Sequence, residues 1–204
     1  MAHLLHIDAS PRGERSHSRK LSREFVNSWM AAHPGDTVIY RDIGLNPVPL
    51  VTEAWIAAIY TPPEAQTVET RELLRPSEEM IAELFAADVY VFGVPMYNLG
   101  VTAGFKAYID QVVRAGRTFN PANLEGLLKG KRLFLAMAAG QDYAVGSPFA
   151  NYNHVLPYLR AVFGFIGVTD FTPIAVATSA GGEDLANSET KAHALIAEVV
   201  GASR

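Results

Sequence analysis

Residues 9–18 form a hydroxyl- and arginine-rich segment whose composition suits a phosphate group. The segment reads ASPRGERSHS and leads into a predicted helix. Backbone N–H groups at a helix start point outward and the helix dipole favours an anion, so amides and hydroxyls here would act together on a phosphate. The segment matches neither the G-x-x-x-x-G-K-[ST] nor the G-x-G-x-x-G nucleotide pattern. The alternative is that Ser16 or Ser18 only caps the helix, and the sequence leaves both interpretations open.

Two further segments combine residue types that suit a flat aromatic ligand. Residues 95–100 read PMYNLG and directly follow an apolar stretch. Met96 and Tyr97 can pack on the face of a ring while Asn98 and loop amides bond its polar edge, although Tyr97 could instead fold back onto the protein. Residues 138–141 read AAGQ, and their small side chains would let the backbone approach a ligand closely.

The hydropathy pattern predicts the elements that must position these segments. Short apolar runs predict strands at 4–7, 37–40, 88–94, 131–138 and 168–177. Amphipathic runs predict helices at 18–32, 52–60, 64–87 with a restart at Pro76, 101–115, 148–165 and 182–200. This alternation predicts a single α/β domain over residues 1–204, with a five-stranded parallel sheet in flavodoxin-like order and helices on both faces, three α/β/α layers in all. The three segments follow strands one, three and four, where such sheets bind ligands.

The composition narrows the chemistry that the chain can perform. Hydrophobic residues make up 49% and charged residues 19% of the chain, which argues against intrinsic disorder. The formal charge of −4 gives no general attraction to nucleic acid or to an anionic membrane. The chain has no cysteine, so thiolate, disulfide and iron–sulfur chemistry are excluded. Six histidines show no metal-ligand spacing, and no signal peptide or membrane span is apparent, so we expect a cytoplasmic protein without a metal site.

Taken together, the segments identify a family resemblance over essentially the whole chain. The matching stretches are Ser10 with residues 16–18, and residues 95–98, 106–110, 114–119 and 163–167. The chain resembles the FMN-dependent NADH:quinone oxidoreductases, also called NADH-azoreductases. Of the matching stretches, the Pro-Met-Tyr-Asn loop is the most specific.

The resemblance implies a flavodoxin-like homodimer that binds FMN and passes two electrons from NADH to a quinone or an azo compound. It places the FMN phosphate against Ser10, Ser16, His17 and Ser18. It places the flavin ring against Pro95, Met96, Tyr97, Asn98, Leu99, Ala138, Ala139, Gly140 and Gln141. Phe119 and Phe165 are assigned to the substrate pocket, and the apolar residues of 55–60 become candidates for the wall over the flavin.

The chain departs from the family pattern at three places. Leu99 stands where the family usually has Phe, which reduces stacking on the ring. Residues 138–141 replace a frequent Ser-Arg-Gly-Gly, so Gln141 becomes the candidate donor near the pyrimidine edge. Asn120 and Pro121 replace an aromatic residue. The backbone amides that would hold a flavin remain, whereas side chains that shape substrate preference differ.

With a flavin bound, the cofactor supplies the redox chemistry and the protein supplies position and electrostatics. The N–H groups of residues 96–98 are expected at N5 and O4 of the ring, and amides near Gly140 at N1 and O2. No catalytic acid or base is assigned, because Tyr97, His154 or solvent could each deliver protons. Two other functions remain open: a single-electron carrier, which is usually more acidic than this chain, and a non-redox domain that binds another phosphate or a partner protein.

Overall fold

Five parallel strands form one sheet in the computed structural model, which describes residues 1–178 and 183–202. The strands are β1 (His3–Asp8), β2 (Thr37–Asp42), β3 (Val89–Pro95), β4 (Arg132–Ala139) and β5 (Asp170–Ala177). Their order is β2-β1-β3-β4-β5, so the order reverses beside β1. The register aligns Asp8 with Gly93 and Pro95 with Ala138. The predicted flavodoxin-like strand order is confirmed.

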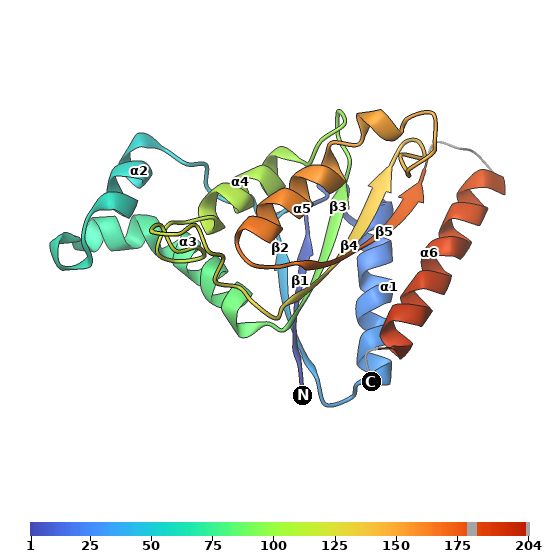
Figure 1. The fold of residues 1–204 in the computed structure, drawn as a ribbon, viewed down its shortest axis with the longest axis horizontal. Coiled ribbons are helices and arrows are strands. Elements are labelled where there is room, and N and C mark those ends of the chain that lie inside the picture. The colour runs from blue at the N-terminus through green and yellow to red at the C-terminus, as the bar shows by residue number, and fades with distance from the viewer. Residues whose placement is uncertain (179–182, 203–204) are drawn as a thin grey trace.

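Helices cover both faces of the sheet and give three layers (Figure 1). On one face lie α1 (His17–Ala32) and α6 (Glu183–Gly201), whose core cluster includes Phe25, Trp29 and Ile196. On the other face lie α3 (Val68–Ala86), α4 (Ala103–Val112) and α5 (Val155–Phe165), which share a larger cluster. The central strand β3 is buried along its whole length, because helices pack on both of its faces.

Two helices begin four or more residues later than the sequence predicts. The long helix begins at Val68 rather than at residue 64 and continues through Pro76 without a restart. Leu74, Ser77 and Met80 are buried around that proline, so tertiary packing holds the helix where local propensity would break it. The fifth helix begins at Val155 rather than at residue 148, because residues before it form a 3-10 turn and the Asn153 side chain accepts the Leu156 N–H.

A short helix, α2 (Glu53–Tyr60), lies outside the three layers at one end of the molecule (Figure 1). Trp55 and Ala58 pack with Leu74 of α3 in a small separate cluster. Ile56 and Tyr60, in contrast, remain exposed. One face of this segment therefore builds a satellite core, whereas the other is open, and its role as a wall over the flavin stays a prediction.

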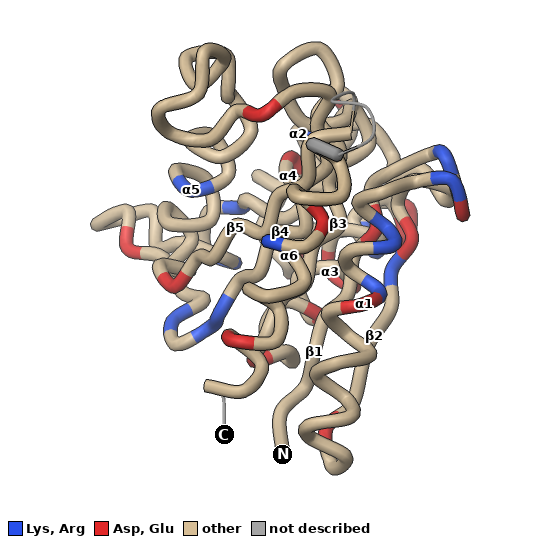
Figure 2. The backbone as a smooth tube through the Cα atoms, turned by 90° about the vertical axis from the view of Figure 1, so that its right-hand side faces the viewer, with Lys and Arg blue, Asp and Glu red and all other residues tan. Residues whose placement is uncertain are grey.

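Acidic and basic residues are interspersed along the chain rather than gathered by sign (Figure 2). Two acidic residues of α3 are paired with arginines of other segments. Glu83 forms a two-bond ion pair with Arg41 of β2, and Glu78 pairs with the buried Arg114. Within the described ranges, no helix is long and apolar enough to cross a membrane.

Candidate functional site

The three segments singled out in the sequence meet at the carboxyl ends of the strands. They enclose a hollow of about 190 Å³. The residues that line it are Ser10, Arg12, Ser16, His17, Pro95, Met96, Tyr97, Ala138, Ala139, Gly140 and Thr178. A parallel sheet brings these loops to one edge, so segments separated by more than a hundred residues form one site.

The start of α1 offers free N–H groups to this hollow. Ser16 is the N-cap, and its hydroxyl accepts the Arg19 N–H at 3.4 Å and contacts the Ser18 hydroxyl at 3.1 Å. No hydrogen bond within the described part of the chain uses the N–H of His17 or of Ser18. Capping and anion binding are therefore compatible, because the cap satisfies one donor and leaves two at the positive end of the helix.

The serines of this loop occupy different positions relative to the hollow. Ser10 and Ser16 line it, and both are buried. Ser18 does not line it and lies beside Ser16 as a hydrogen-bond partner. Arg12, whose N–H donates to the Ser10 hydroxyl at 3.3 Å, also lines the hollow, although the sequence assigned only its segment, and not this residue, to a phosphate.

Residues 97–100 form a tight turn with strained backbone. Tyr97 and Gly100 exchange both backbone hydrogen bonds, at 3.0 and 3.1 Å. Asn98 and Leu99, the two central residues, have φ values of 48° and 70°. This is the pattern of a type I′ turn, in which a leucine is an unusual occupant. Strain of this kind persists where surrounding structure enforces it and is concentrated at functional sites.

The turn corrects one expectation about which amides face a ligand. The Met96 N–H donates to the Ala138 carbonyl at 2.8 Å, and the Tyr97 N–H is used by Gly100. Neither is available to a ring: the first bond follows from the register of β3 with β4, and the second closes the turn itself. Of the three amides expected there, only the Asn98 N–H has no acceptor among the described residues.

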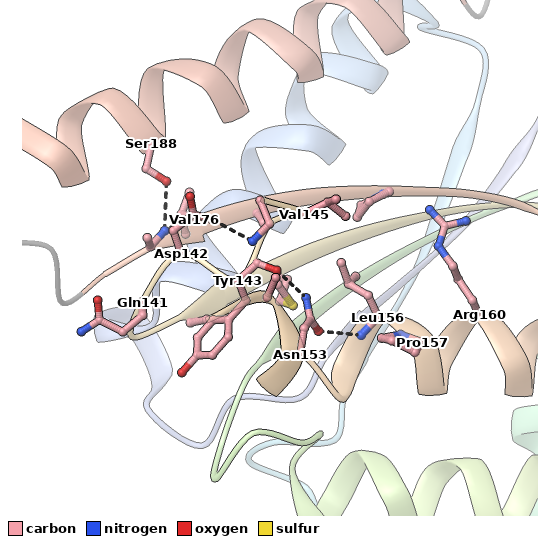
Figure 3. Close-up of a pocket in the computed structure, with 17 residues that line it drawn as sticks. Gln141, Asp142, Tyr143, Val145, Asn153, Leu156, Pro157, Arg160, Val176 and Ser188 are labelled. Atoms are coloured by element: carbon pink, nitrogen blue, oxygen red, sulfur yellow. Dashed lines mark hydrogen bonds between the residues drawn. The ribbon is translucent and has the colours of Figure 1, made fainter. Parts of the chain in front are cut away.

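The loop after β4 divides between two cavities. Ala138, Ala139 and Gly140 line the small hollow, where the Ala139 carbonyl accepts both the N–H and the hydroxyl of Thr178. Gln141 instead lines a larger cavity of about 620 Å³ between β4, β5 and α5 (Figure 3). Thr178 is a lining residue that sequence reasoning missed, since a lone threonine after a strand carries no motif.

Phe119 and Phe165 contact each other, but neither lines the small hollow. Their ring centroids lie 4.7 Å apart, with Phe165 as the last residue of α5 and Phe119 in the loop that follows α4. Asn98 and Leu99 are likewise not among the lining residues. His154 reaches the turn through its backbone, because its N–H donates to the Leu99 carbonyl at 3.2 Å.

Comparison with known proteins places this site in a family. A family model described as a flavodoxin-like fold matches residues 2–199. A protein of Nostoc punctiforme named FMN-dependent NADH:quinone oxidoreductase is 49% identical over 202 residues, covering 98% of each chain. The chain belongs to the FMN-dependent NADH:quinone oxidoreductase family. A second relative with that name, from another Nostoc strain, is 53% identical over 187 residues and covers 90% of each chain.

A solved structure agrees with this family membership. The crystal structure of an azoreductase from Bacillus anthracis has a TM-score of 0.87 and 27% identity, covering 98% of this chain and 99% of its own. The donor groups at this site suit FMN, the cofactor in the name of this family. A phosphate requires hydrogen-bond donors, and the start of α1 has free amides with buried hydroxyls beside them. A ring edge also requires a donor, and the adjoining turn has the free Asn98 N–H.

Behind the serine loop, charged groups are buried and fully paired. The hydrogen bond with Asp42 raises the pKa of Arg19. Burial acts to raise the pKa of Asp42, but hydrogen bonds from Arg19 and from the Leu45 and Gly44 N–H groups outweigh it, so that pKa is lowered. Burial, with the nearby Asp8 carboxylate, raises the pKa of Tyr40 to about 12. These ionisation states therefore stay fixed near neutral pH, and the groups act as structure rather than as acids or bases.

Proposed function

We propose that this protein binds FMN and transfers two electrons from NADH to quinones and azo compounds. The observation that carries the proposal is the shared hollow: His17, at the start of α1 where N–H groups are free, and Met96 and Tyr97 line one space. The names of the relatives from Nostoc support the cofactor and the quinone, and the azoreductase structure supports the azo substrate.

In this proposal the serine loop binds the phosphate of the cofactor. The N–H groups of His17 and Ser18 donate to it at the positive end of α1, and the Ser10 and Ser16 hydroxyls add donors from the walls. The Arg12 side chain supplies a positive charge at the rim. Ser18 acts mainly through its N–H and through its hydrogen bond to Ser16.

The other loops orient the ring. Met96 and Tyr97 supply apolar surface, the Asn98 N–H donates to the ring edge, and Gly140 allows close approach. FMN, when bound, supplies the chemistry of accepting a hydride and releasing two electrons. The chain needs only to hold the substrate flat against this site, so its contribution is proximity and water exclusion rather than acid–base catalysis.

We further propose that a second copy of the chain completes the site. A hollow of about 190 Å³ is smaller than the roughly 300–1,000 Å³ typical of ligand pockets, so one chain covers only part of the cofactor. The half-exposed Tyr97 is left open beside it. An apolar groove between α4 and α5, lined by Val113, Val162 and Phe165, offers a surface for the second copy.

Titration with FMN tests the cofactor, and turnover tests the reaction. We expect the purified protein to be yellow, or to become so with FMN, and to oxidise NADH when a quinone is added. A protein that stays colourless after FMN addition would overturn the flavin proposal. Binding of FMN without NADH oxidation would favour a single-electron carrier instead. Sedimentation of a monomer at micromolar concentration would contradict the two-copy site.

A further inference from the structure

A buried network anchored on Arg19 contacts the phosphate-side loop from behind. Arg19 is 3% exposed, although arginine is among the residues least often buried. Its Nε and Nη2 both donate to the Ser10 carbonyl, at 2.8 and 2.6 Å. Its Nη1 and Nη2 also donate to the two carboxylate oxygens of Asp42, at 2.8 and 2.6 Å. One side chain therefore joins the loop after β1 to the end of β2.

The rest of the network fixes Arg19 itself. Tyr40, which is 52% exposed, and Asp8 both lie beside it: the Tyr40 hydroxyl donates to Asp8 at 3.1 Å, and Asp8 lies 3.7 Å from Arg19. The Ser22 hydroxyl donates to the other oxygen of Asp8 at 2.8 Å. Each polar group in this network thus has a partner, which is the condition under which a buried charged network is rigid.

The space around the Ser10 carbonyl is filled as well. A Cβ on Gly44 would overlap the Ser10 carbonyl and would lie 2.8 Å from Nη2 of Arg19. The carbonyl is therefore held from two sides, by the guanidinium and by the chain at residue 44. The Ser10 peptide group can neither rotate nor withdraw without breaking charge-assisted hydrogen bonds from Arg19.

The charges of the network also determine whether an anion is repelled at the phosphate-side loop. Asp8 is buried behind a loop that we have assigned to a phosphate, and Asp42 is largely buried beside it. Two carboxylates in that position would repel a phosphate, because Coulomb interactions are strong where water is excluded. The guanidinium of Arg19 lies against both and offsets their charge.

We propose that Arg19 is a positioning residue for phosphate recognition: it fixes the Ser10 peptide group so that the Ser10 hydroxyl faces the bound phosphate, and it neutralises the carboxylates behind that site. Arg19 does not line the hollow and so acts through Ser10. The proposal rests on FMN being the ligand. It differs from a general stabilising role in that it concerns only the phosphate end of the cofactor.

Comparison of FMN with riboflavin, which lacks the phosphate, separates these roles. The dissociation constants of both are measured by quenching of flavin fluorescence for the wild-type protein, Arg19→Gln, Arg19→Lys and Arg23→Gln. Arg23 is a matched control, since it lies one turn further along α1 and pairs with Glu14 of the same loop, but in solvent. The ratio of the two constants reports the contribution of the phosphate alone.

We expect Arg19→Gln to weaken FMN about tenfold or more, the size of a lost charge-assisted interaction, and to leave riboflavin within about twofold. Arg19→Lys keeps the charge but not both bonds to Ser10, so we expect an intermediate loss. Arg23→Gln should change neither constant.

An unchanged ratio of the FMN and riboflavin dissociation constants in both Arg19→Gln and Arg19→Lys would overturn the inference, whether the two affinities fall equally or do not fall at all. If Arg19→Gln does not fold, Arg19→Lys decides by the same ratio. Failure of the wild-type protein to bind FMN would overturn the proposed function itself. If the wild-type protein binds FMN but substitutions of Arg19 leave the ratio unchanged, only the inference about Arg19 is overturned.

Discussion

The two ends of the proposed cofactor site are built differently. At the phosphate end, Ser10 and Ser16 are buried and backed by the paired charges of Arg19, Asp8 and Asp42. At the ring end, Tyr97 is half exposed, and Asn98 and Leu99 are held at positive φ in a surface turn. The first end is rigid within one chain, whereas the second is an open surface. We infer that the chain fixes the phosphate by itself and leaves the ring accessible to substrates and to a second copy.

Asp42→Asn should have the largest effect on the rigid end. It leaves Arg19 buried with one fewer carboxylate, and breaking such a pair costs about 3 kcal/mol of unfolding free energy at pH 7. The pKa of Asp42 is lowered in the folded state, so its contribution to stability is complete above the ordinary aspartate pKa of 3.8 and is lost as the pH falls through the folded-state pKa. Urea denaturation at pH 7 and pH 3 measures this. A difference from wild type that persists undiminished at pH 3 would contradict the electrostatic cause.

Gly93→Ala should also act on the rigid end, with a cost of about 2 kcal/mol for overpacking. A Cβ at this position would overlap the Asp8 carboxylate and lie 2.8 Å from the Ser22 hydroxyl, so the network behind the phosphate loop must shift. Gly164→Ala is the matched control, because it lies in α5 with nothing within 4 Å and should be neutral or slightly stabilising. Thermal unfolding compares the two, and equal melting temperatures would show that the network yields easily.

Ser16→Ala and Ser18→Ala divide the serine loop between capping and binding. Ser16 both caps α1 and lines the hollow, so its loss should cost about 1 kcal/mol of stability as well as FMN affinity. Ser18 keeps its N–H in the alanine variant, so FMN should weaken less. Denaturation and FMN titration of both variants check this. Loss of stability in Ser16→Ala with unchanged FMN affinity would make that serine a cap only.

The sequence could predict the features that depend on local patterns, but not the contacts that depend on how separate elements pack. Periodicity and connection rules are local, so they gave the strands, the strand order and the three loops that meet. They could not show that the Met96 N–H is used by Ala138, because that depends on the register of two strands. They also missed the pairing of Arg41 with Glu83 and of Arg19 with Asp42, since each joins side chains from different elements. Thr178 carries no motif, and only the fold brings it to the hollow.

Leu99→Gly should have the smallest effect on stability and tests the open end. Glycine adopts positive φ without the Cβ clash that costs a leucine about 1 kcal/mol, but it also loses more entropy on folding. The net gain in stability should be about 0.5 kcal/mol or less. Affinity for FMN should change little, because the phosphate contacts are untouched, while the KM for a quinone should rise as the turn loosens. Denaturation, FMN titration and steady-state kinetics distinguish these effects. A large loss of FMN affinity would show that the turn at Leu99 holds the cofactor as firmly as the serine loop does, and the division between a rigid and an open end would then be wrong.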